Sequence, residues 1–221
     1  MPSPETASEE GIAPSGAAGP PPLVVFDLGN VLIRWDPHPA VAAGVGASEA
    51  DRFLAAADFD FYAWNHRQDA GRSWDDAEAE VAVSTPHWAA HARSYRRHFD
   101  ASLIGPLGDN VAVLQDLAAA GISLVALTNW SAELFPRALA RFDFLALFDD
   151  IVVSGAEALA KPDPAIFALL AQRVGRPLSG CVFVDDSAAN VEAGAAAGLD
   201  AVHVVPGLDL RAALAGRGLP L

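Results

Sequence analysis

Short apolar runs recur along the chain, separated by stretches with helical periodicity. Five of these runs are rich in Val, Leu or Ile and end in polar or turn-forming residues, so they predict buried parallel strands. They lie at residues 23–26, 123–127, 151–153, 181–184 and 201–205. Helical patterns follow at residues 110–120, 132–142, 164–174 and 188–197. Strand followed by helix, repeated, predicts an α/β fold with a doubly wound parallel sheet.

Residues 36–103 break this alternation. They contain no β-branched run, and Ala-rich amphipathic patterns near residues 47–57, 74–83 and 87–99 predict helices instead. Pro37 at one limit, and the glycines and proline of residues 105–108 at the other, suit hinge connections. We therefore expect two domains in the folded part of the chain. They are a Rossmann-like core of residues 23–35 and 104–221, and a small helical cap of residues 36–103 inserted after the first strand.

Composition limits the size of the hydrophobic core and the cellular compartment that we expect for this protein. The chain has 221 residues, of which 52% are apolar, so it can bury one good core and a small accessory domain. Its single cysteine, Cys181, excludes an intrachain disulfide framework and indicates a reducing, cytoplasmic location. No apolar stretch approaches the ~20 residues of a membrane span. Residues 1–22 lack a basic start and an apolar centre, so we expect a disordered tail and no signal peptide.

The charge balance limits the partners. A net charge of −14 disfavours nucleic acids and anionic membranes, which are held mainly through Lys and Arg. A small phosphorylated molecule needs only local positive charge. We therefore expect a small-molecule phosphorylated substrate, no nucleic acid, no membrane, and a monomer or homodimer.

Two segments place polar groups at strand ends. Asp27 directly follows the first predicted strand and precedes Gly29, and ligands of open α/β sheets bind at the carboxyl ends of strands. Taken alone, such an aspartate is more often a turn or helix-cap residue. Thr128 and Asn129 follow the second strand, where a hydroxyl and backbone N–H groups could bind an anion. Thr128 fits an ordinary helix N-cap equally well.

Two further segments add a lysine and paired carboxylates. Lys161 is the only lysine beside thirteen arginines, and it precedes a proline where a helix begins. Its retention favours a compact point charge on a reactive carboxylate and phosphate. Asp185 and Asp186 end the fourth strand, and adjacent like charges are unfavourable unless a cation or hydrogen bonds compensate. Their hard oxygen atoms suit Mg²⁺.

Together, these segments resemble the four motifs of the haloacid dehalogenase superfamily of hydrolases, in chain order and from residue 23 to about residue 205. The resemblance implies that Asp27 is the nucleophile and that Lys161 bridges it to the phosphate. It further implies that Thr128 and the Asn129 amide hold the phosphoryl group. The cofactor would be Mg²⁺, held by Asp27, Asp185, Asp186 and the carbonyl of Gly29. The helical insertion would be the mobile cap of this family.

Gly29 departs from the family pattern. Most phosphatases of the superfamily carry a second aspartate at this position as general acid and base, a role that typically contributes ~10²–10⁴-fold. A similar Asp-x-Gly-Asn start occurs in the branch that includes α-D-glucose-1-phosphate phosphatase, whose leaving group is comparatively acidic. We therefore expect a Mg²⁺-dependent phosphatase that acts on a small phosphorylated metabolite, preferably a sugar phosphate, through an aspartyl-phosphate.

Two other functions stay open. The 2-haloacid dehalogenase branch uses the same aspartate without a metal, but Asp185 and Asp186 would then repel the substrate carboxylate, and the aromatic-glycine pair of that branch is replaced by Gly29-Asn30. A catalytically weak phosphometabolite-binding protein is the third reading. Slow phosphate release with measurable phosphosugar binding would favour it.

The cap should supply the contacts to the leaving group, because the motifs reach only the phosphoryl group and the metal. Residues 64–72 are polar, contain a glycine and lie between two helical patterns, as a substrate loop would. An ordinary solvated connection is the competing interpretation. The candidate substrate-binding residues of the cap are Trp64, His66, Arg67 and Arg72. The tryptophans of the insertion, Trp64 included, also fit a cap core.

Overall fold

The computed structural model describes residues 22–221, and the predicted tail of residues 1–22 lies outside this range except for Pro22. A parallel sheet of five strands forms the core, in the order β5-β4-β1-β6-β7. The strands are β1 (Leu23–Phe26), β4 (Ser123–Thr128), β5 (Asp150–Val153), β6 (Val182–Asp185) and β7 (Asp200–His203). The predicted doubly wound α/β fold is therefore confirmed, with strand bounds shifted by two residues at most.

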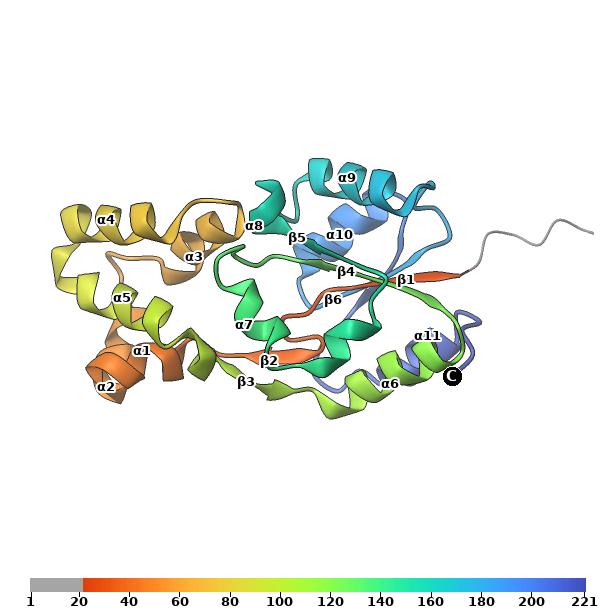
Figure 1. The fold of residues 1–221 in the computed structure, drawn as a ribbon, viewed down its shortest axis with the longest axis horizontal. Helices are drawn as coiled ribbons and strands as arrows, with labels where there is room; N and C mark the ends of the chain where they lie inside the picture. Colours follow the sequence, from red (N-terminus) through yellow and green to blue (C-terminus); the bar gives the residue numbers. More distant parts are fainter. Residues whose placement is uncertain (1–21) are drawn as a thin grey trace, which may run out of the picture.

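Helices cover both faces of this sheet (Figure 1). Val24 and Phe26 of the central strand lie on the face of the sheet that α6 (Gly108–Ala119) and α11 (Leu210–Ala215) cover. Val25 lies on the opposite face, which α9 (Pro164–Val174) covers. This alternation follows from the two-residue period of a strand that is buried on both faces. Helix α10 (Ala188–Ala196) lies between β6 and β7 in the chain and contacts both strands.

The insertion forms a helical lobe beside the sheet (Figure 1). It consists of α1 (His38–Val45), α2 (Ala47–Leu54), α3 (Phe61–Asp69), α4 (Trp74–Ser84), η1 (Pro86–Trp88), α5 (Ala89–Arg97) and η2 (Phe99–Ser102). Two short antiparallel strands, β2 (Ile33–Trp35) and β3 (Leu103–Pro106), connect this lobe to the core. In the text below, "cap" means the segment from α1 to η2.

Several elements differ from the sequence-based expectation, among them the short strands β2 and β3 and the helix α8 (Ser154–Glu157), which were not predicted. Helices α1 and α3 were not predicted, and most of the expected substrate loop at residues 64–72 belongs to α3. This helix begins where the Asp60 side chain accepts a hydrogen bond from the N–H of Ala63, a signal that its weak apolar periodicity obscured. The helix expected at residues 132–142 is reduced to α7 (Phe135–Leu139), because a turn at Ser131 precedes it and Pro136 favours the first turn of a helix. The sequence patterns also missed α11.

No helix in residues 22–221 has both the length and the apolar character needed to cross a membrane.

Candidate active site

Asp27 lies at the carboxyl end of the central strand. Its backbone N–H donates to the carbonyl of Val184 in the adjacent strand. This contact fixes Asp27 where the strands have their carboxyl ends, and this end of the sheet is called the sheet edge. The side chain is buried and only 10% exposed. Burial, together with the neighbouring charges of Asp185 and Asp186, raises the pKa of Asp27 to about 7, although Lys161 opposes this shift.

Lys161 joins the acidic groups of the site. Its ammonium nitrogen is 2.9 Å from Oδ1 of Asp27, 2.6 Å from Oδ2 of Asp185 and 2.6 Å from the carbonyl oxygen of Leu127. The side chain is 1% exposed. Burial alone would lower the pKa of Lys161, but the two carboxylates outweigh it and raise the pKa. The lysine therefore stays charged, with all three of its donors directed at oxygen atoms.

Asp185 and Asp186 complete a cluster of three carboxylates. Asp27, Asp185 and Asp186 each offer one oxygen, and these atoms lie within 4.8 Å of one another. The remaining contacts of Asp185 are the N–H of Ser187 at 2.8 Å and the side-chain amide of Asn190 at 3.0 Å. Burial and the charge of Asp185 raise the pKa of Asp186. One lysine does not balance three carboxylates, and their hard oxygen atoms fit Mg²⁺.

Thr128 and Asn129 lie beside this cluster, at the end of β4. Thr128 is buried, and its hydroxyl oxygen has no hydrogen-bond partner among the described residues. A buried hydroxyl without a partner is unfavourable unless a ligand satisfies it. The Asn129 side chain holds the backbone of Lys161, because it donates to the carbonyl at 2.8 Å and accepts from the N–H at 2.8 Å. It thereby positions the lysine.

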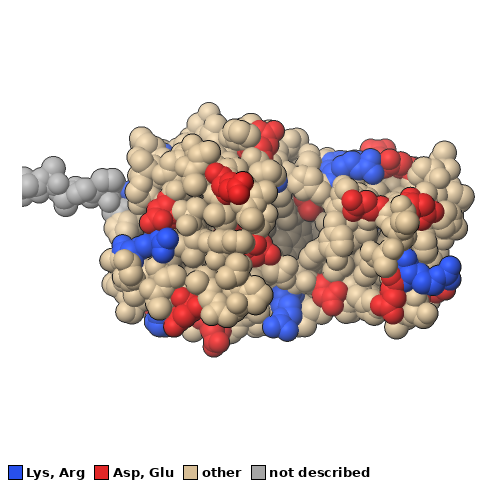
Figure 2. All heavy atoms as spheres, turned by 180° about the vertical axis from the view of Figure 1, so that it is seen from behind, with Lys and Arg blue, Asp and Glu red and all other residues tan. Residues whose placement is uncertain are grey.

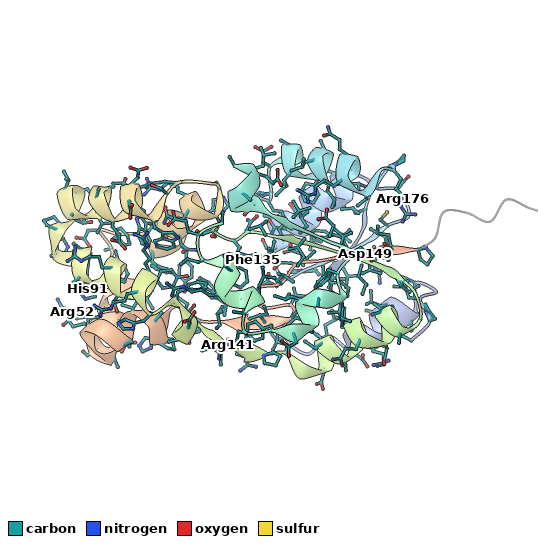
Figure 3. The ribbon with its side chains drawn as sticks, in the orientation of Figure 1. Arg52, His91, Phe135, Arg141, Asp149 and Arg176 are labelled. Carbon is teal, nitrogen blue, oxygen red and sulfur yellow. The ribbon has the colours of Figure 1, made fainter. Side chains whose placement is uncertain are left out.

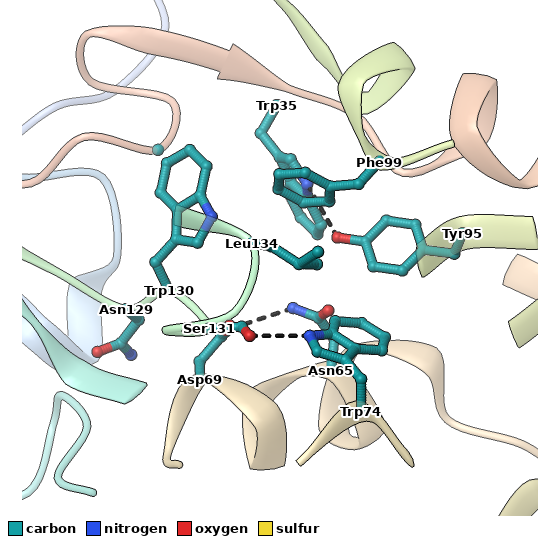
Figure 4. A pocket seen from close by; sticks show the side chains of 11 residues that line it. Trp35, Asn65, Asp69, Trp74, Tyr95, Phe99, Asn129, Trp130, Ser131 and Leu134 are labelled. Atoms are coloured by element: carbon teal, nitrogen blue, oxygen red, sulfur yellow. Dashed lines mark hydrogen bonds between the residues drawn. The ribbon is translucent and has the colours of Figure 1, made fainter. Parts of the chain in front are cut away.

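A cavity of about 100 Å³ lies between the sheet edge and the cap (Figure 4). Gly29 and Asn129 line it on the core side, and Asn65 and Asp69 of α3 line it on the cap side. Most of its remaining wall is aromatic or aliphatic: Trp35, Trp74, Tyr95, Phe99, Trp130 and Leu134. The molecular surface is hollowed where the two lobes meet, with acidic side chains beside the hollow (Figure 2).

Several hydrogen bonds fasten the cap over the cavity. The Trp74 indole donates to the hydroxyl of Ser131 at 2.8 Å, and the Trp74 backbone N–H donates to Glu133 at 2.9 Å. The hydroxyl of Ser154 donates to the carbonyl of Asp69 at 2.5 Å. Gly155 lets the short helix α8 (Ser154–Glu157) lie close to the segment that carries Ser131, because a Cβ there would lie 2.6 Å from the backbone nitrogen of Ala132. These contacts fix the cap against the core beside the cavity.

The structure gives the four cap residues that the sequence singled out other contacts. Trp64 is buried in the cap core, and its indole is 3.4 Å from the carbonyl of Ala77. Arg67 pairs with Glu80 at 3.0 Å. Arg72 pairs with the same carboxylate, and His66 is exposed. None of these four lines the cavity, so their role in substrate binding stays a prediction that their packing does not support.

Sequence reasoning missed Asp69 and Trp130, which do line the cavity. Asp69 lies within the segment 64–72 but was not singled out among its polar residues. Burial raises its pKa to about 7, while the N–H of Ser131 opposes that shift. Trp130 follows the Thr128-Asn129 motif directly, and this position is the one signal that could have identified it.

The histidines and arginines at the outer end of the cap lie away from this site. His91 and Arg52 mark that end in Figure 3. His87 pairs with Asp58, and His91 lies 3.5 Å from Glu49. The only cluster of at least three metal-ligating side chains among residues 22–221 is the carboxylate trio at the sheet edge.

Comparisons with known proteins agree with this geometry. A family model described as haloacid dehalogenase-like hydrolase matches residues 21–198. The phosphoglycolate phosphatase of Pseudomonas syringae is 25% identical over 190 residues, which cover 82% of this chain and 68% of that protein. The sesquiterpene phosphatase astK of Aspergillus oryzae is 23% identical over 186 residues, covering 83% of this chain and 90% of the relative.

A solved structure has the same fold. The magnesium complex of a HAD family enzyme from Bacteroides thetaiotaomicron superposes with a TM-score of 0.69 at 17% identity. The match covers 89% of this chain and 99% of that structure.

Proposed function

The chain belongs to the haloacid dehalogenase-like hydrolase family, and we propose that it is a magnesium-dependent phosphatase that works through an aspartyl-phosphate on Asp27. Its substrate would be a small phosphate monoester. The sequence resemblance favours a sugar phosphate, and the names of the relatives, phosphoglycolate phosphatase and sesquiterpene phosphatase, support a phosphate ester while differing in the rest of the molecule.

The carboxylate cluster is the observation that carries this proposal. Three carboxylates have oxygens within 4.8 Å of one another, and the one buried ammonium group among them pairs with two, Asp27 and Asp185. A metal-free dehalogenase would have to bring a substrate carboxylate against this acidic cluster, which is unfavourable at short range. A phosphate ester together with a divalent cation supplies the missing positive charge and benefits from the same carboxylates.

The roles of the Asp27 oxygens follow from their contacts. Oδ1 accepts from Lys161, whereas Oδ2 faces Gly29, where a Cβ would lie 3.8 Å from it. Oδ2 is therefore the atom free to attack phosphorus. As the Oδ2–P bond forms, the bond from phosphorus to the ester oxygen breaks, and the alcohol leaves after taking a proton. Water then attacks the phosphorus of the acyl phosphate and restores Asp27.

Other residues would hold the phosphoryl group during this exchange. The unpaired hydroxyl of Thr128 would donate to a non-bridging oxygen, and Lys161 would neutralise charge beside Asp27. Mg²⁺ on Asp27, Asp185, Asp186 and the Gly29 carbonyl would further neutralise charge on the phosphoryl oxygens. Asn129 contributes by positioning Lys161.

A substrate screen tests the proposal. Phosphate release from p-nitrophenyl phosphate and glucose 1-phosphate, and halide release from 2-chloropropionate, would be measured with Mg²⁺ and with excess chelator. We expect phosphate release that requires Mg²⁺. Halide release in chelator would point to the dehalogenase instead, and binding of phosphosugars without turnover of any ester would point to a binding protein.

A further inference from the structure

The polar groups of the cavity wall are largely paired with one another. Asn65 donates to Oδ2 of Asp69 at 3.1 Å, and the hydroxyl of Ser131 accepts from the Trp74 indole (Figure 4). The Trp35 indole donates to the hydroxyl of Tyr95 at 3.3 Å. A sugar in this cavity would lose water from several hydroxyls and find few free partners, which is unfavourable.

Trp130 provides an independent sign of a ligand. The residue is 6% exposed, and its indole nitrogen has no hydrogen-bond partner among the described residues. In Figure 4 this nitrogen faces the space enclosed by the aromatic rings. A buried N–H without an acceptor is unfavourable, so one acceptor atom of a bound molecule would satisfy it.

We infer that this cavity binds the leaving group of the substrate, and that this group is compact and mainly apolar, such as an arylmethyl or a short branched alkenyl alcohol. The inference rests on the proposed phosphatase function, because it assigns only the part of the ester beyond the phosphoryl group. No lysine or arginine lines the cavity within the described chain, so a second anionic group has no counter-charge there. An enclosed apolar cavity of about 150 Å³ holds benzene, so this partly open cavity of about 100 Å³ has one ring as the upper limit of the group that it takes.

A matched pair of esters tests this inference. Benzyl phosphate and glycerol 1-phosphate release primary alcohols of similar acidity, so their kcat/KM values compare the fit of the leaving group rather than its reactivity. We expect benzyl phosphate to be favoured by about tenfold or more, because its ring is buried against aromatic side chains. A kcat/KM for glycerol 1-phosphate that equals or exceeds that for benzyl phosphate would overturn the inference.

A variant pair tests the cavity itself. Leu134→Ala removes part of the wall and so enlarges the cavity. It should therefore raise the kcat/KM of naphthylmethyl phosphate relative to that of benzyl phosphate. Leu145→Ala is the matched control, because Leu145 is equally buried, at 3% exposure, but does not line the cavity. Equal ratios in the two variants would contradict the assignment, and melting curves would show that both variants fold.

The outcomes separate this inference from the proposed function. If wild-type protein releases phosphate from no ester, including p-nitrophenyl phosphate, the phosphatase proposal fails. The cavity is then still tested by tryptophan fluorescence, where benzylphosphonate should bind more tightly than methylphosphonate. Equal binding of the two phosphonates would overturn the apolar site even without turnover.

A second inference concerns the acid that Gly29 does not supply. Asp69 is the only carboxylate that lines the cavity within the described chain, and it shares this lining with Gly29. Two core contacts hold it there: Ser154 donates to its backbone carbonyl, and the N–H of Ser131 donates to its carboxylate. The carboxyl is therefore fixed at the junction of the phosphoryl site and the leaving-group cavity.

We propose that Asp69 is the general acid of the reaction. Its carboxyl gives a proton to the ester oxygen as the bond to phosphorus breaks, and the resulting carboxylate takes a proton from the water that attacks the Asp27 acyl phosphate. The proton balance is thus restored after each turnover. This second inference also rests on the proposed function. A pKa of about 7, caused by burial, keeps part of this carboxyl protonated near neutral pH.

The dependence on the leaving group tests the proposal. Asp69→Asn should lower kcat/KM for benzyl phosphate by about 10²–10⁴-fold. The value for p-nitrophenyl phosphate should change little, because its leaving anion needs no proton. Glu133→Gln is the control, since Glu133 also docks the cap, through the N–H of Trp74, but does not line the cavity. Equal losses on both esters in Asp69→Asn would reduce Asp69 to a structural role.

Rescue offers a second measurement. A Cβ at Gly29 would meet only Oδ2 of Asp27, at 3.8 Å, so the backbone at this position accepts a side chain, and Gly29→Asp places a carboxyl group there. In the Asp69→Asn background, Gly29→Asp should restore at least about tenfold of the lost benzyl phosphate activity. No recovery in a folded double variant that still hydrolyses p-nitrophenyl phosphate would contradict the proposal. Absence of p-nitrophenyl phosphate turnover in the wild type would instead contradict the phosphatase function.

Discussion

The sheet edge and the cavity wall meet at the same site but differ in their side chains, which are mostly charged at the edge and mostly aromatic in the wall. At the edge, Asp27, Lys161 and Asp185 are buried and bound to one another, and the acidic cluster still lacks positive charge. In the wall, aromatic rings dominate and the polar groups are largely paired among themselves. The edge is suited to a phosphoryl group with its cation, and the wall to whatever the phosphoryl group is attached to.

This difference assigns recognition of the phosphoryl group to the edge and recognition of the leaving group to the wall. Charged groups at strand ends recognise a group that is common to every phosphate ester, so a change there should affect all substrates alike. A change in the wall should affect substrates according to their leaving group. Substitutions in the two regions should therefore be distinguishable by comparing esters with different leaving groups.

Loss of the nucleophile should have the largest effect. Asp27→Asn removes the attacking carboxylate, so kcat should fall by about 10⁴-fold or more on every ester, whatever its leaving group. Steady-state phosphate release measures this. Asp109→Asn, at an exposed carboxylate away from the site, is the control and should retain activity. Turnover close to wild type in Asp27→Asn would remove Asp27 from the mechanism.

Loss of Lys161 should lower the stability of the folded protein. Lys161→Met leaves Asp27 and Asp185 buried without their shared counter-ion, and removal of one partner from a buried ion pair typically costs 3–5 kcal/mol. Urea unfolding in chelator should show a loss of about this size, and Mg²⁺ should recover part of it. A free energy of unfolding that matches wild type would show that the ion pair has little structural weight.

Metal binding should stabilise the edge by mass action. Mg²⁺ at about one hundred times its dissociation constant should add about 2.7 kcal/mol to the free energy of unfolding, and the melting temperature should rise accordingly. Asp186→Asn removes one ligand of the trio and should weaken this response. An unchanged melting temperature, with full activity in chelator, would favour metal-free chemistry.

The two cap arginines should show the smallest effect. Arg67 and Arg72 both pair with Glu80 rather than line the cavity, and partly exposed ion pairs contribute about 0–1 kcal/mol. Arg67→Ala with Arg72→Ala should therefore lower the melting temperature slightly and leave KM values for glucose 1-phosphate and p-nitrophenyl phosphate in the same ratio. A KM increase confined to the sugar phosphate would restore the substrate role that the sequence suggested for these arginines.

Much of the fold could be predicted from the sequence because its signals are local. The five strands are apolar runs that end in polar residues, and α9 begins at Pro164 and ends before Gly175, as helix boundary signals predict. Most site residues at the edge could be proposed for the same reason: Asp27, Thr128 and Asp185 lie at or directly after strand ends, and parallel strands bring their carboxyl ends together. Lys161 follows its strand only after a short helix, and its signal was that it is the only lysine of the chain. The structure brings Asp27, Lys161 and Asp185 into direct contact, and Thr128 ends the adjacent strand β4.

The rest depended on tertiary contacts that no local pattern encodes. Helix α3 has little apolar periodicity, because it packs through a few large residues such as Phe61 and Trp64. The importance of Asp69 arises only when Ser131 and Ser154, from two separate segments of the core, hold it at the cavity. Arg67 and Arg72 looked free for substrate in the sequence, and their partner, Glu80, lies one helix further along the chain.

Covalent trapping of the intermediate tests the central claim most directly. Wild-type protein would be mixed with benzyl phosphate and Mg²⁺, quenched, reduced with borohydride and analysed by peptide mass spectrometry, since reduction converts an aspartyl-phosphate to homoserine. The account predicts homoserine at position 27, with Asp185 and Asp186 unmodified and no conversion in Asp27→Asn. Turnover of the ester with Asp27 unmodified, or conversion at a different carboxylate, would contradict it.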